Sequence, residues 1–358
     1  MSLALRLAEQ GRYTVSPNPM VGCVIVKDNQ IVGRGYHQRA GEPHAEIFAL
    51  REAKEHARGA TAYITLEPCT HQGRTPPCVL SLLQADIKKV VIACKDPNPL
   101  VSGKGIEILR SKGVEVELGL CEEEAMRLNT IFFHYITHKK PYVIAKWAMS
   151  IDGKTIVNQY DRKQISCNES QKHTHDLRHQ VDAILVGAAT ARIDNPELTI
   201  RCFSGEEIHK HPKRIILCGG RPLAKELKIF HAEMPSETIL AVSRQGMEWA
   251  SKLNSNSNSC QILVLPEEDR GHIELSALLN KLGEMEITSL LVEGGQTVHQ
   301  SFFKQNLVNK LHVYLCPSMI GTFPSKKQMT ISQCEKIGCD FHFVAEVNQR
   351  ESLCLAAL

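Results

Sequence analysis

The chain has 358 residues, 43% of them hydrophobic, and a formal net charge of +3. This length exceeds what a single core usually serves, so two domains are predicted. A charge so close to neutral, with only 5% aromatic residues, gives no basis for a nucleic-acid partner. No apolar run reaches the length of a membrane span and the first residues lack a signal-peptide pattern, so no membrane partner is expected.

The number and spacing of the cysteines indicate the cellular compartment of the protein. There are thirteen, an odd number, without the spacing of a disulfide framework. With no export signal in the sequence, they are expected to be reduced thiols in a cytoplasmic protein. Most free cysteines are small buried hydrophobes, and that interpretation holds for eleven of them.

The first third of the chain alternates strand and helix patterns. Residues 2–11 predict a short amphipathic helix, and residues 21–26 and 31–33 predict the two strands of a hairpin. A helix is predicted to begin near His44, with His44 and Glu46 in its first turn. Strands are predicted at residues 61–66 and 89–93, so the β-α-β rhythm indicates a layered α/β domain.

The strongest chemical signal runs from His44 to Cys78. Cys69 follows the predicted strand at residues 61–66, and Pro77 and Cys78 open the next predicted helix, whose dipole favours a thiolate. One imidazole and two thiolates suit Zn²⁺ and leave its fourth tetrahedral position to water. Glu46 lies close enough to reach that water, and the His-x-Glu…Pro-Cys order is the zinc-deaminase signature. We therefore predict zinc ligands His44, Cys69 and Cys78, with Glu46 as the general acid and base.

Less specific interpretations of this stretch stay open at this point. A His-x-Glu triplet and a Pro-Cys pair are each common. A structural zinc would need a fourth protein ligand, which His71 could supply. Eight residues, 70–77, separate the two thiols, far more than in a Cys-x-x-Cys motif. That insertion needs an explanation of its own.

A polar break at residues 137–141 predicts a domain boundary, which divides the chain into residues 1–140 and 141–358. The second part is again predicted to be α/β, with helical stretches between strands. These strands are predicted at residues 142–148, 183–186, 214–217, 239–242, 262–265, 289–292 and 311–315. Residues 254–259 predict a polar surface loop. No internal repeat is found.

Gly294 and Gly295 follow the predicted strand at residues 289–292 and precede an amphipathic segment. Glycines there let a backbone approach a phosphate, which the N–H groups of the next helix would bind. Two glycines after a strand are more often part of an ordinary turn. Residues 194–196 likewise predict a turn and residues 150–153 a hairpin.

Taken together, these segments resemble one family, the bifunctional riboflavin-biosynthesis deaminase–reductases of bacteria. The first half resembles that family at residues 17–22, 41–46 and 67–78. The second half does so at residues 146–154, 189–190, 194–196, 198–199, 201 and 292–295. The block Pro-Cys-Thr-His-Gln-Gly-Arg-Thr-Pro-Pro-Cys at residues 68–78 is highly specific and accounts for the long gap between the thiols.

The resemblance implies a cytidine-deaminase-like three-layer domain followed by a dihydrofolate-reductase-like α/β domain. It implies two consecutive reactions. Hydroxide generated at zinc would deaminate 2,5-diamino-6-ribosylamino-4(3H)-pyrimidinone 5′-phosphate, and NADPH would then reduce the ribosyl side chain to ribityl. The expected cofactors are Zn²⁺ and NADPH, the expected partner is a small nucleotide-like substrate, and a homo-oligomer is expected.

The resemblance also implies which residues contact each molecule. Those expected to bind NADPH are Ala148, Gln164, Thr190, Asp194, Gly295, Gln296 and Thr297. Those expected to bind substrate are Asn18, His71 and Arg74 in the first domain and Arg162, Arg178, Leu198, Arg201 and Glu293 in the second.

The sequence departs from the family at residues 162–166, which read Arg-Lys-Gln-Ile-Ser where a Ser-x-Trp-Ile-Thr-like segment is usual. Arg162 replaces a small hydroxyl residue and could pair with a phosphate. Gln164 replaces an aromatic residue and cannot stack as an indole does.

Two other functions compete with this one. The chain could be a zinc deaminase of another base or nucleotide with a non-catalytic C-terminal domain. It could also be a binding module that zinc merely holds together.

Overall fold

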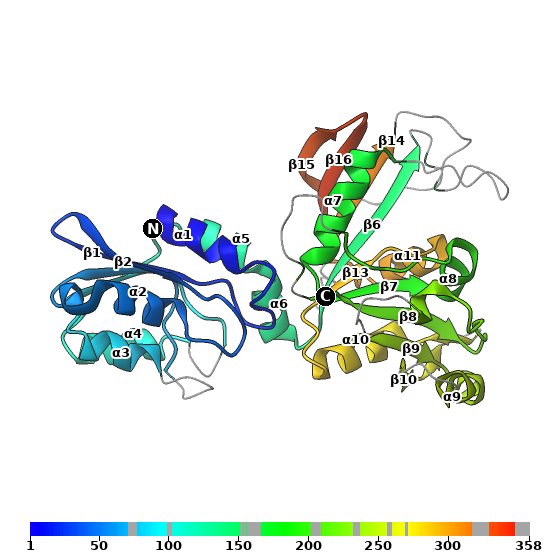
Figure 1. The fold of residues 1–358 in the computed structure, drawn as a ribbon, viewed down its shortest axis with the longest axis horizontal. Coiled ribbons are helices and arrows are strands. Elements are labelled where there is room, and N and C mark those ends of the chain that lie inside the picture. The colour runs from blue at the N-terminus through cyan, green and yellow to red at the C-terminus, as the bar shows by residue number, and fades with distance from the viewer. Residues whose placement is uncertain are drawn as a thin grey trace, which may run out of the picture. The chain divides into compact units, whose positions relative to one another are not determined.

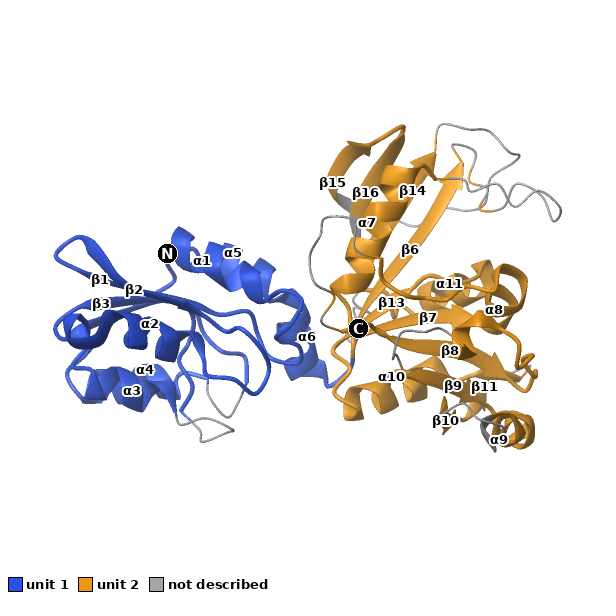
Figure 2. Cartoon of the chain, in the orientation of Figure 1, with its two compact units in different colours: residues 1–140 blue, residues 141–358 orange. Residues whose placement is uncertain are grey.

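The computed structural model divides into two compact units, residues 1–140 and residues 141–358 (Figure 2). It describes residues 1–70, 77–98, 102–150, 153, 155, 166–201, 208, 210–231, 237–255, 260–268, 271–316 and 329–347. Each unit has its own buried apolar core and its own main sheet. Both units are α/β, as the sequence predicts.

Unit 1 is built on a five-stranded sheet in the order β2-β1-β3-β4-β5. Strand β1 is antiparallel to both β2 and β3, whereas β3, β4 and β5 run parallel. The strands are β1 Gly22–Lys27, β2 Gln30–Tyr36, β3 Thr61–Leu66, β4 Lys89–Cys94 and β5 Glu115–Leu118. The predicted hairpin is therefore present as β1–β2.

Helices cover both faces of this sheet, which gives the predicted three layers. Helices α1 and α5 lie on one face and α2, α3 and α4 on the other (Figure 1). Their bounds are α1 Ser2–Ala8, α2 Ala45–Ala53, α3 Cys78–Gln84, α4 Lys104–Ser111, α5 Glu122–Leu128 and α6 Thr130–His138, with 3₁₀ turns at Glu9–Gly11 and Lys54–Ala57.

Small residues bring helix α2 close to strand β2. A Cβ atom on Gly35 would lie 2.2 Å from the carbonyl oxygen of Ala45, and one on Gly33 would lie 2.2 Å from that of Ala49. Ala45, Ala49 and Ala53 recur every fourth residue and are fully buried. Because both surfaces lack bulk, the helix lies directly on the strand, and its first turn is fixed at the end of the sheet.

A buried carboxylate fixes the loops at the same end of unit 1. Glu67, which is 3% exposed, follows β3 directly. Its Oε1 accepts the N–H groups of Gly105 and Ile106, and its Oε2 accepts those of Asp96 and Gly103. One side chain thus ties the end of β3 to the segment after β4 and to the start of α4. The neighbouring Pro68–Cys69 segment is positioned by this anchor.

We expect Glu67→Gln to destabilise unit 1 by about 2–4 kcal/mol, because the amide NH₂ would face two backbone donors and leave them unsatisfied. Urea unfolding measures this loss. Glu107→Gln, at an exposed site on α4, is the matched control. Equal unfolding midpoints for the two variants would contradict the anchoring role.

Unit 2 is built on a sheet of nine described strands in the order β10-β9-β8-β7-β13-β6-β14-β16-β15. The strands from β10 to β14 in this order are parallel, and β16 and β15 are antiparallel to their neighbours. They are β6 Tyr142–Ser150, β7 Ala183–Gly187, β8 Lys213–Gly219, β9 Thr238–Val242, β10 Cys260–Val264, β13 Ser289–Val292, β14 Lys310–Cys316, β15 Met329–Ile337 and β16 Asp340–Val347.

The helices of unit 2 are α7 Asn168–His179, α8 Ala188–Asp194, α9 Met247–Ser255, α10 Leu275–Glu284 and α11 Gln296–Lys304. Short 3₁₀ turns lie at Lys228–Phe230 and Arg244–Gly246, and the two-stranded ribbon β11 Glu267–Glu268 and β12 His272–Ile273 completes the unit.

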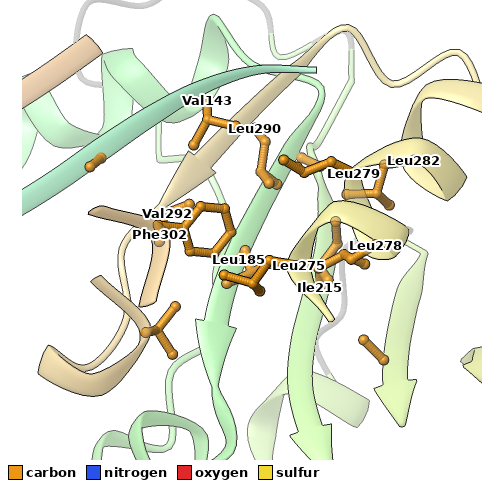
Figure 3. Packing of buried hydrophobic residues seen from close by; sticks show 14 of the residues in the cluster. Val143, Leu185, Ile215, Leu275, Leu278, Leu279, Leu282, Leu290, Val292 and Phe302 are labelled. Atoms are coloured by element: carbon orange, nitrogen blue, oxygen red, sulfur yellow. The ribbon is translucent and has the colours of Figure 1, made fainter. Parts of the chain in front are cut away.

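The core of unit 2 lies between the sheet and helices α10 and α11. Leu275, Leu278, Leu279 and Leu282 form one stripe of α10 at helical spacing, and each is at most 2% exposed. Figure 3 shows them beside residues of β7, β8 and β13, with Phe302 of α11 on the same side. Each such buried leucine contributes about 1.5–3 kcal/mol of burial free energy.

The structure differs from the predictions at several points. Strands β15 and β16 were not predicted. Residues 254 and 255 end helix α9 instead of beginning a loop, and residues 256–259 lie outside the described part. His44 precedes the first turn of α2 as its N-cap, and Pro77 holds the same position before α3. Among the described helices, none combines the length and apolarity that a bilayer crossing requires.

Candidate active sites

The first site lies where three elements of unit 1 meet. His44 is the N-cap of α2, Cys69 follows β3, and Cys78 is the first residue of α3. Cys78 Sγ lies 3.2 Å and Cys69 Sγ 3.5 Å from His44 Nδ1. The three donor atoms all lie within 4.8 Å of one another.

These donors fit a zinc ion. With Zn–S near 2.3 Å and Zn–N near 2.0–2.1 Å, tetrahedral geometry sets an N···S separation of about 3.5 Å. The two observed N···S distances agree with that value. The backbone N–H of Cys78 also points to Cys69 Sγ at 3.4 Å, so a helix N-terminus faces the thiol.

The thiols differ in their protonation. The hydrogen bond from Cys78, with His44 as a second donor, lowers the pKa of Cys69 to about 4 despite partial burial. The pKa of Cys78 is raised, chiefly because its proton is shared with Cys69 and because it is buried. The pKa of His44 is raised by its hydrogen bond to Cys69. These shifts favour the thiolate form of Cys69, which is the form that binds a metal.

Glu46 lies in the first turn of α2 and is 3% exposed. Burial raises the pKa of its carboxyl, and the negative charge of Cys69 acts in the same direction. Its Oε2 atom is buried and has no hydrogen-bond partner among the described residues. A buried acceptor oxygen without a partner beside three metal donors is the arrangement that a metal-activated water would complete.

Asn18 reaches this site through a residue that was not predicted, His37. The Nδ1 atom of His37 lies 3.2 Å from the carbonyl oxygen of Pro43, which can only accept, so Nδ1 carries the proton. Nε2 then accepts a hydrogen bond from the amide nitrogen of Asn18 at 3.0 Å. The ring of His37 also lies edge-on to that of His44, at 5.3 Å between centroids. His71 and Arg74 lie outside the described residues.

A second site forms in unit 2 at the carboxyl ends of the parallel strands β7, β13 and β6. Neighbouring parallel strands end at the same edge of a sheet, and ligands of open α/β sheets bind there. Strand β13 leads through Glu293, Gly294 and Gly295 into α11, whose first turn contains Gln296 and Thr297. Strand β7 leads directly into α8.

The two glycines bring these elements together. Gly295 has φ +74°, and a Cβ atom there would lie 3.1 Å from Thr190 Oγ1 of α8. A Cβ on Gly294 would lie 2.6 Å from Val186 of β7. The backbone therefore passes Thr190 closely at the N-terminus of α11, a geometry that suits a phosphate-bearing cofactor.

The other residues expected to contact NADPH are placed as follows. Ala148 is half-buried near the end of β6, and Asp194 is exposed at the end of α8. Gln164 lies outside the described residues.

Arg178 and Glu293, both expected to bind substrate, form a buried ion pair. Arg178 Nε lies 2.6 Å from Oε1 of Glu293, and an Nη atom lies 2.9 Å from Oε2. A further Arg178 nitrogen donates to the carbonyl oxygen of Thr199 at 3.0 Å. Burial would raise the pKa of Glu293, but the attraction of Arg178 and of Lys146 outweighs it and lowers that pKa to about 2. Lys146, whose pKa burial lowers, is a charged neighbour that was not predicted.

The remaining residues expected to bind substrate differ in exposure. Leu198 is 2% exposed and has φ +53°, so its side chain belongs to the core. The side chain of Arg201 is 65% exposed and pairs with Glu197 at 3.6 Å, while its backbone N–H donates to His175. Arg162 lies outside the described residues.

Comparisons with known proteins match each half of the chain to a described family. The family description "Cytidine and deoxycytidylate deaminase zinc-binding region" matches residues 1–94, and "RibD C-terminal domain" matches residues 141–343. The riboflavin biosynthesis protein RibD of Aquifex aeolicus is 44% identical over 321 residues, which cover 90% of this chain and 87% of that protein. The chain belongs to the RibD family.

Solved structures agree with this assignment. RibD of Acinetobacter baumannii, form 1, is 35% identical with a TM-score of 0.87, over 97% of this chain and 98% of that one. The diaminohydroxyphosphoribosylaminopyrimidine deaminase/5-amino-6-(5-phosphoribosylamino)uracil reductase of Thermotoga maritima is 31% identical with a TM-score of 0.82, over 97% of each chain.

Membership of this family confirms the resemblance seen in the sequence and the expected fold class. The chain is a bifunctional deaminase and reductase of riboflavin biosynthesis, with Zn²⁺ and NADPH as cofactors. The match over residues 141–343 argues against a non-catalytic C-terminal domain, and the deaminase match argues against a mere binding module.

We expect Cys69→Ala to hold one equivalent less zinc than the unmodified chain after dialysis, because a thiolate ligand is lost. Metal content by mass spectrometry measures this. Cys94→Ala, at another buried cysteine of unit 1, should keep the full content. Equal zinc in both variants would exclude Cys69 from the ligand set.

The Arg178–Glu293 pair predicts a pH dependence of stability. Because the pKa of Glu293 is depressed in the folded state, its contribution is present above pH 4.5 and is lost as the pH falls towards 2. The difference in unfolding free energy between the unmodified chain and Glu293→Gln, about 3 kcal/mol near neutral pH, should therefore shrink below pH 4.5. Urea unfolding at pH 6, 4.5 and 3 tests this, and a constant difference would contradict it.

Proposed function

We propose that residues 1–140 form the deaminase domain and residues 141–358 the reductase domain. The substrate is 2,5-diamino-6-ribosylamino-4(3H)-pyrimidinone 5′-phosphate, a small nucleotide-like molecule, and deamination precedes reduction. The observation that carries the first step is the convergence of His44, Cys69 and Cys78 beside the unpartnered carboxylate oxygen of Glu46. The Thermotoga maritima relative is named for both activities, a deaminase and a reductase.

In the deaminase domain, His44, Cys69 and Cys78 hold zinc. The ion supplies a Lewis acid that makes a water molecule nucleophilic near neutral pH. Glu46 would accept one proton of the attacking water and pass it to the ring nitrogen. It would then move the proton of the added hydroxyl to the amino group, which leaves as ammonia while the carbonyl forms. Its raised pKa suits both tasks, because a carboxyl that titrates closer to neutrality both accepts and returns a proton readily.

Asn18 orients the pyrimidine. One of its amide hydrogens is committed to His37, which leaves the other hydrogen and the carbonyl oxygen for the ring. His37 is in turn held by Pro43, so the amide orientation is set before substrate arrives. His71 and Arg74 meet the remaining polar groups or the phosphate, as the family resemblance implies.

In the reductase domain, the N-terminus of α11 binds a phosphate of NADPH. Gly295, Gln296 and Thr297 provide backbone donors there, and Thr190 lines the same space. Ala148, Gln164 and Asp194 complete the cofactor contacts. The cofactor supplies hydride, and the protein supplies position and charge.

Substrate is bound beside the cofactor by Arg162, Arg178, Arg201 and Glu293, and by the backbone of Leu198, whose side chain is buried. The bidentate pair of Arg178 with Glu293 fixes both side chains, so that each presents a defined charge to the ribosyl group. Lys146, half-buried near Glu293, adds a positive charge on the same side.

We also propose a cytoplasmic homo-oligomer. Zinc binding requires reduced Cys69 and Cys78, which a reducing compartment maintains. Among the described strands, β15 is the last of its sheet, and such an edge offers backbone groups to a second copy. Light scattering of the purified chain measures the assembly.

We expect Glu46→Gln to retain zinc and fold while deamination falls by several powers of ten, because the amide cannot accept and return a proton. Product analysis with the diaminopyrimidinone phosphate measures this loss. Glu55→Gln, at an exposed residue after α2, is the control and should be fully active.

The same Glu46→Gln protein should reduce the deaminated intermediate at the normal rate when NADPH is present. That result would show that the reductase domain is intact. Normal deamination by Glu46→Gln would disprove its role as general acid and base.

A further inference from the structure

A second group of metal-binding side chains lies in unit 2, among residues that neither reaction uses. His173 of α7, Glu335 of β15 and His342 of β16 each direct a donor atom into a common space. These three atoms all lie within 4.8 Å of one another. Imidazole and carboxylate donors together are a set that first-row transition metals accept.

Strand register places two of the three donors on one face of the sheet. Glu335 pairs directly with His342, and His342 pairs directly with Tyr314 of β14. Residues directly opposite each other in neighbouring strands project to the same face. The ring of His173 lies edge-on to that of His342, with 4.5 Å between centroids, so α7 covers this face (Figure 1).

Each imidazole also has one ring nitrogen within hydrogen-bonding distance of another side chain. His173 Nδ1 lies 2.9 Å from the hydroxyl of Tyr314, and His342 Nε2 lies 2.9 Å from Nδ1 of His312. The other nitrogen of His342, Nδ1, lies 3.1 Å from Oε1 of Glu335. Histidines that bind metals almost always have their second nitrogen engaged in this way, which fixes the ring orientation and tautomer.

The charges around the cluster are compatible with a cation. Asp176 on α7 adds a negative charge near His173, whereas Lys310 on β14 opposes a cation near His342. Glu335 is 44% exposed, so the cluster borders solvent at this residue.

We propose that His173, Glu335 and His342 bind a first-row transition-metal dication such as Zn²⁺, with water as its fourth ligand. The donors approach one another on binding, since tetrahedral zinc holds nitrogen and oxygen ligands roughly 3–3.5 Å apart. The metal joins α7 to the β15–β16 ribbon. Because α7 also contains Arg178, the metal stabilises the position of the helix that bears this residue. The metal itself takes no part in either reaction.

A hydrogen-bonded relay from His312 through His342 to Glu335 is the competing explanation of the same geometry. In that relay, His312 donates to His342, and His342 donates to Glu335. It satisfies both nitrogens of His342 without a metal, so the two explanations differ in one measurable respect, the number of metal ions bound.

The test is a titration of the untagged, metal-free full chain with Co²⁺, followed by absorption and by metal analysis. We expect two equivalents. The first gives a thiolate-to-cobalt charge-transfer band, and the second adds ligand-field intensity without that band, since its donors contain no sulfur. Cys69→Ala removes the band and keeps the second equivalent.

Two variants remove the second equivalent only. Glu335→Gln should weaken it at least tenfold, and His173→Phe, which keeps a ring beside Tyr314, should abolish it while the charge-transfer band remains. Glu346→Gln, which removes a carboxylate elsewhere on β16, is the control and should bind two equivalents. A single equivalent in the unmodified chain, or a second one that both Glu335→Gln and His173→Phe retain, would overturn the proposal.

Discussion

The deaminase site depends on one constraint. The metal-binding atoms of three side chains from three separate elements must lie within a few ångströms of one another. His44 caps helix α2, Cys78 begins helix α3, and Cys69 follows strand β3. The hydrogen bonds that join these donors all involve sulfur and are weak, so they do not enforce this placement. The scaffold enforces it. The glycines of β2 set how closely α2 lies on the sheet, and the four hydrogen bonds of Glu67 set where the chain leaves β3.

The second site, in unit 2, positions its charged residues by pairing them with each other. Arg178 comes from a helix and Glu293 from the segment after a strand, and they form an ion pair in which the side chains are 15% and 8% exposed. Removing either partner would leave the other charge uncompensated and would lower the free energy of unfolding by several kcal/mol. The pair therefore stabilises the fold only while both residues are present. Beside it, the close approach of Gly295 to Thr190 leaves backbone donors for a phosphate. The charged side chains expected to bind substrate and the backbone donors expected to bind the cofactor phosphate thus lie at the same edge of the sheet.

Sequence patterns predicted much of this arrangement and missed parts of it for identifiable reasons. Parallel strands such as β13 are continuous apolar runs, so their positions were predictable to within a residue or two. The residue types at His44, Cys69 and Cys78 specified a metal chemistry, but their separation in space follows only from the fold. His37 was missed because its contact with Asn18 depends on the register of β1 with β2. Strand β15 was missed because a register shift between Ile331 and Gln333 breaks its alternation. Strand β16 does alternate, with His342 between Phe341 and Phe343, and could have been predicted.

The most direct test of the whole account is mass spectrometry of the diaminopyrimidinone phosphate incubated with zinc-loaded protein, with and without NADPH. We predict deaminated product alone when NADPH is absent, and its conversion to the ribityl compound once NADPH is added. Deamination that NADPH does not carry further would contradict the assignment of the reductase site. Reduction of the substrate before deamination would contradict the proposed order.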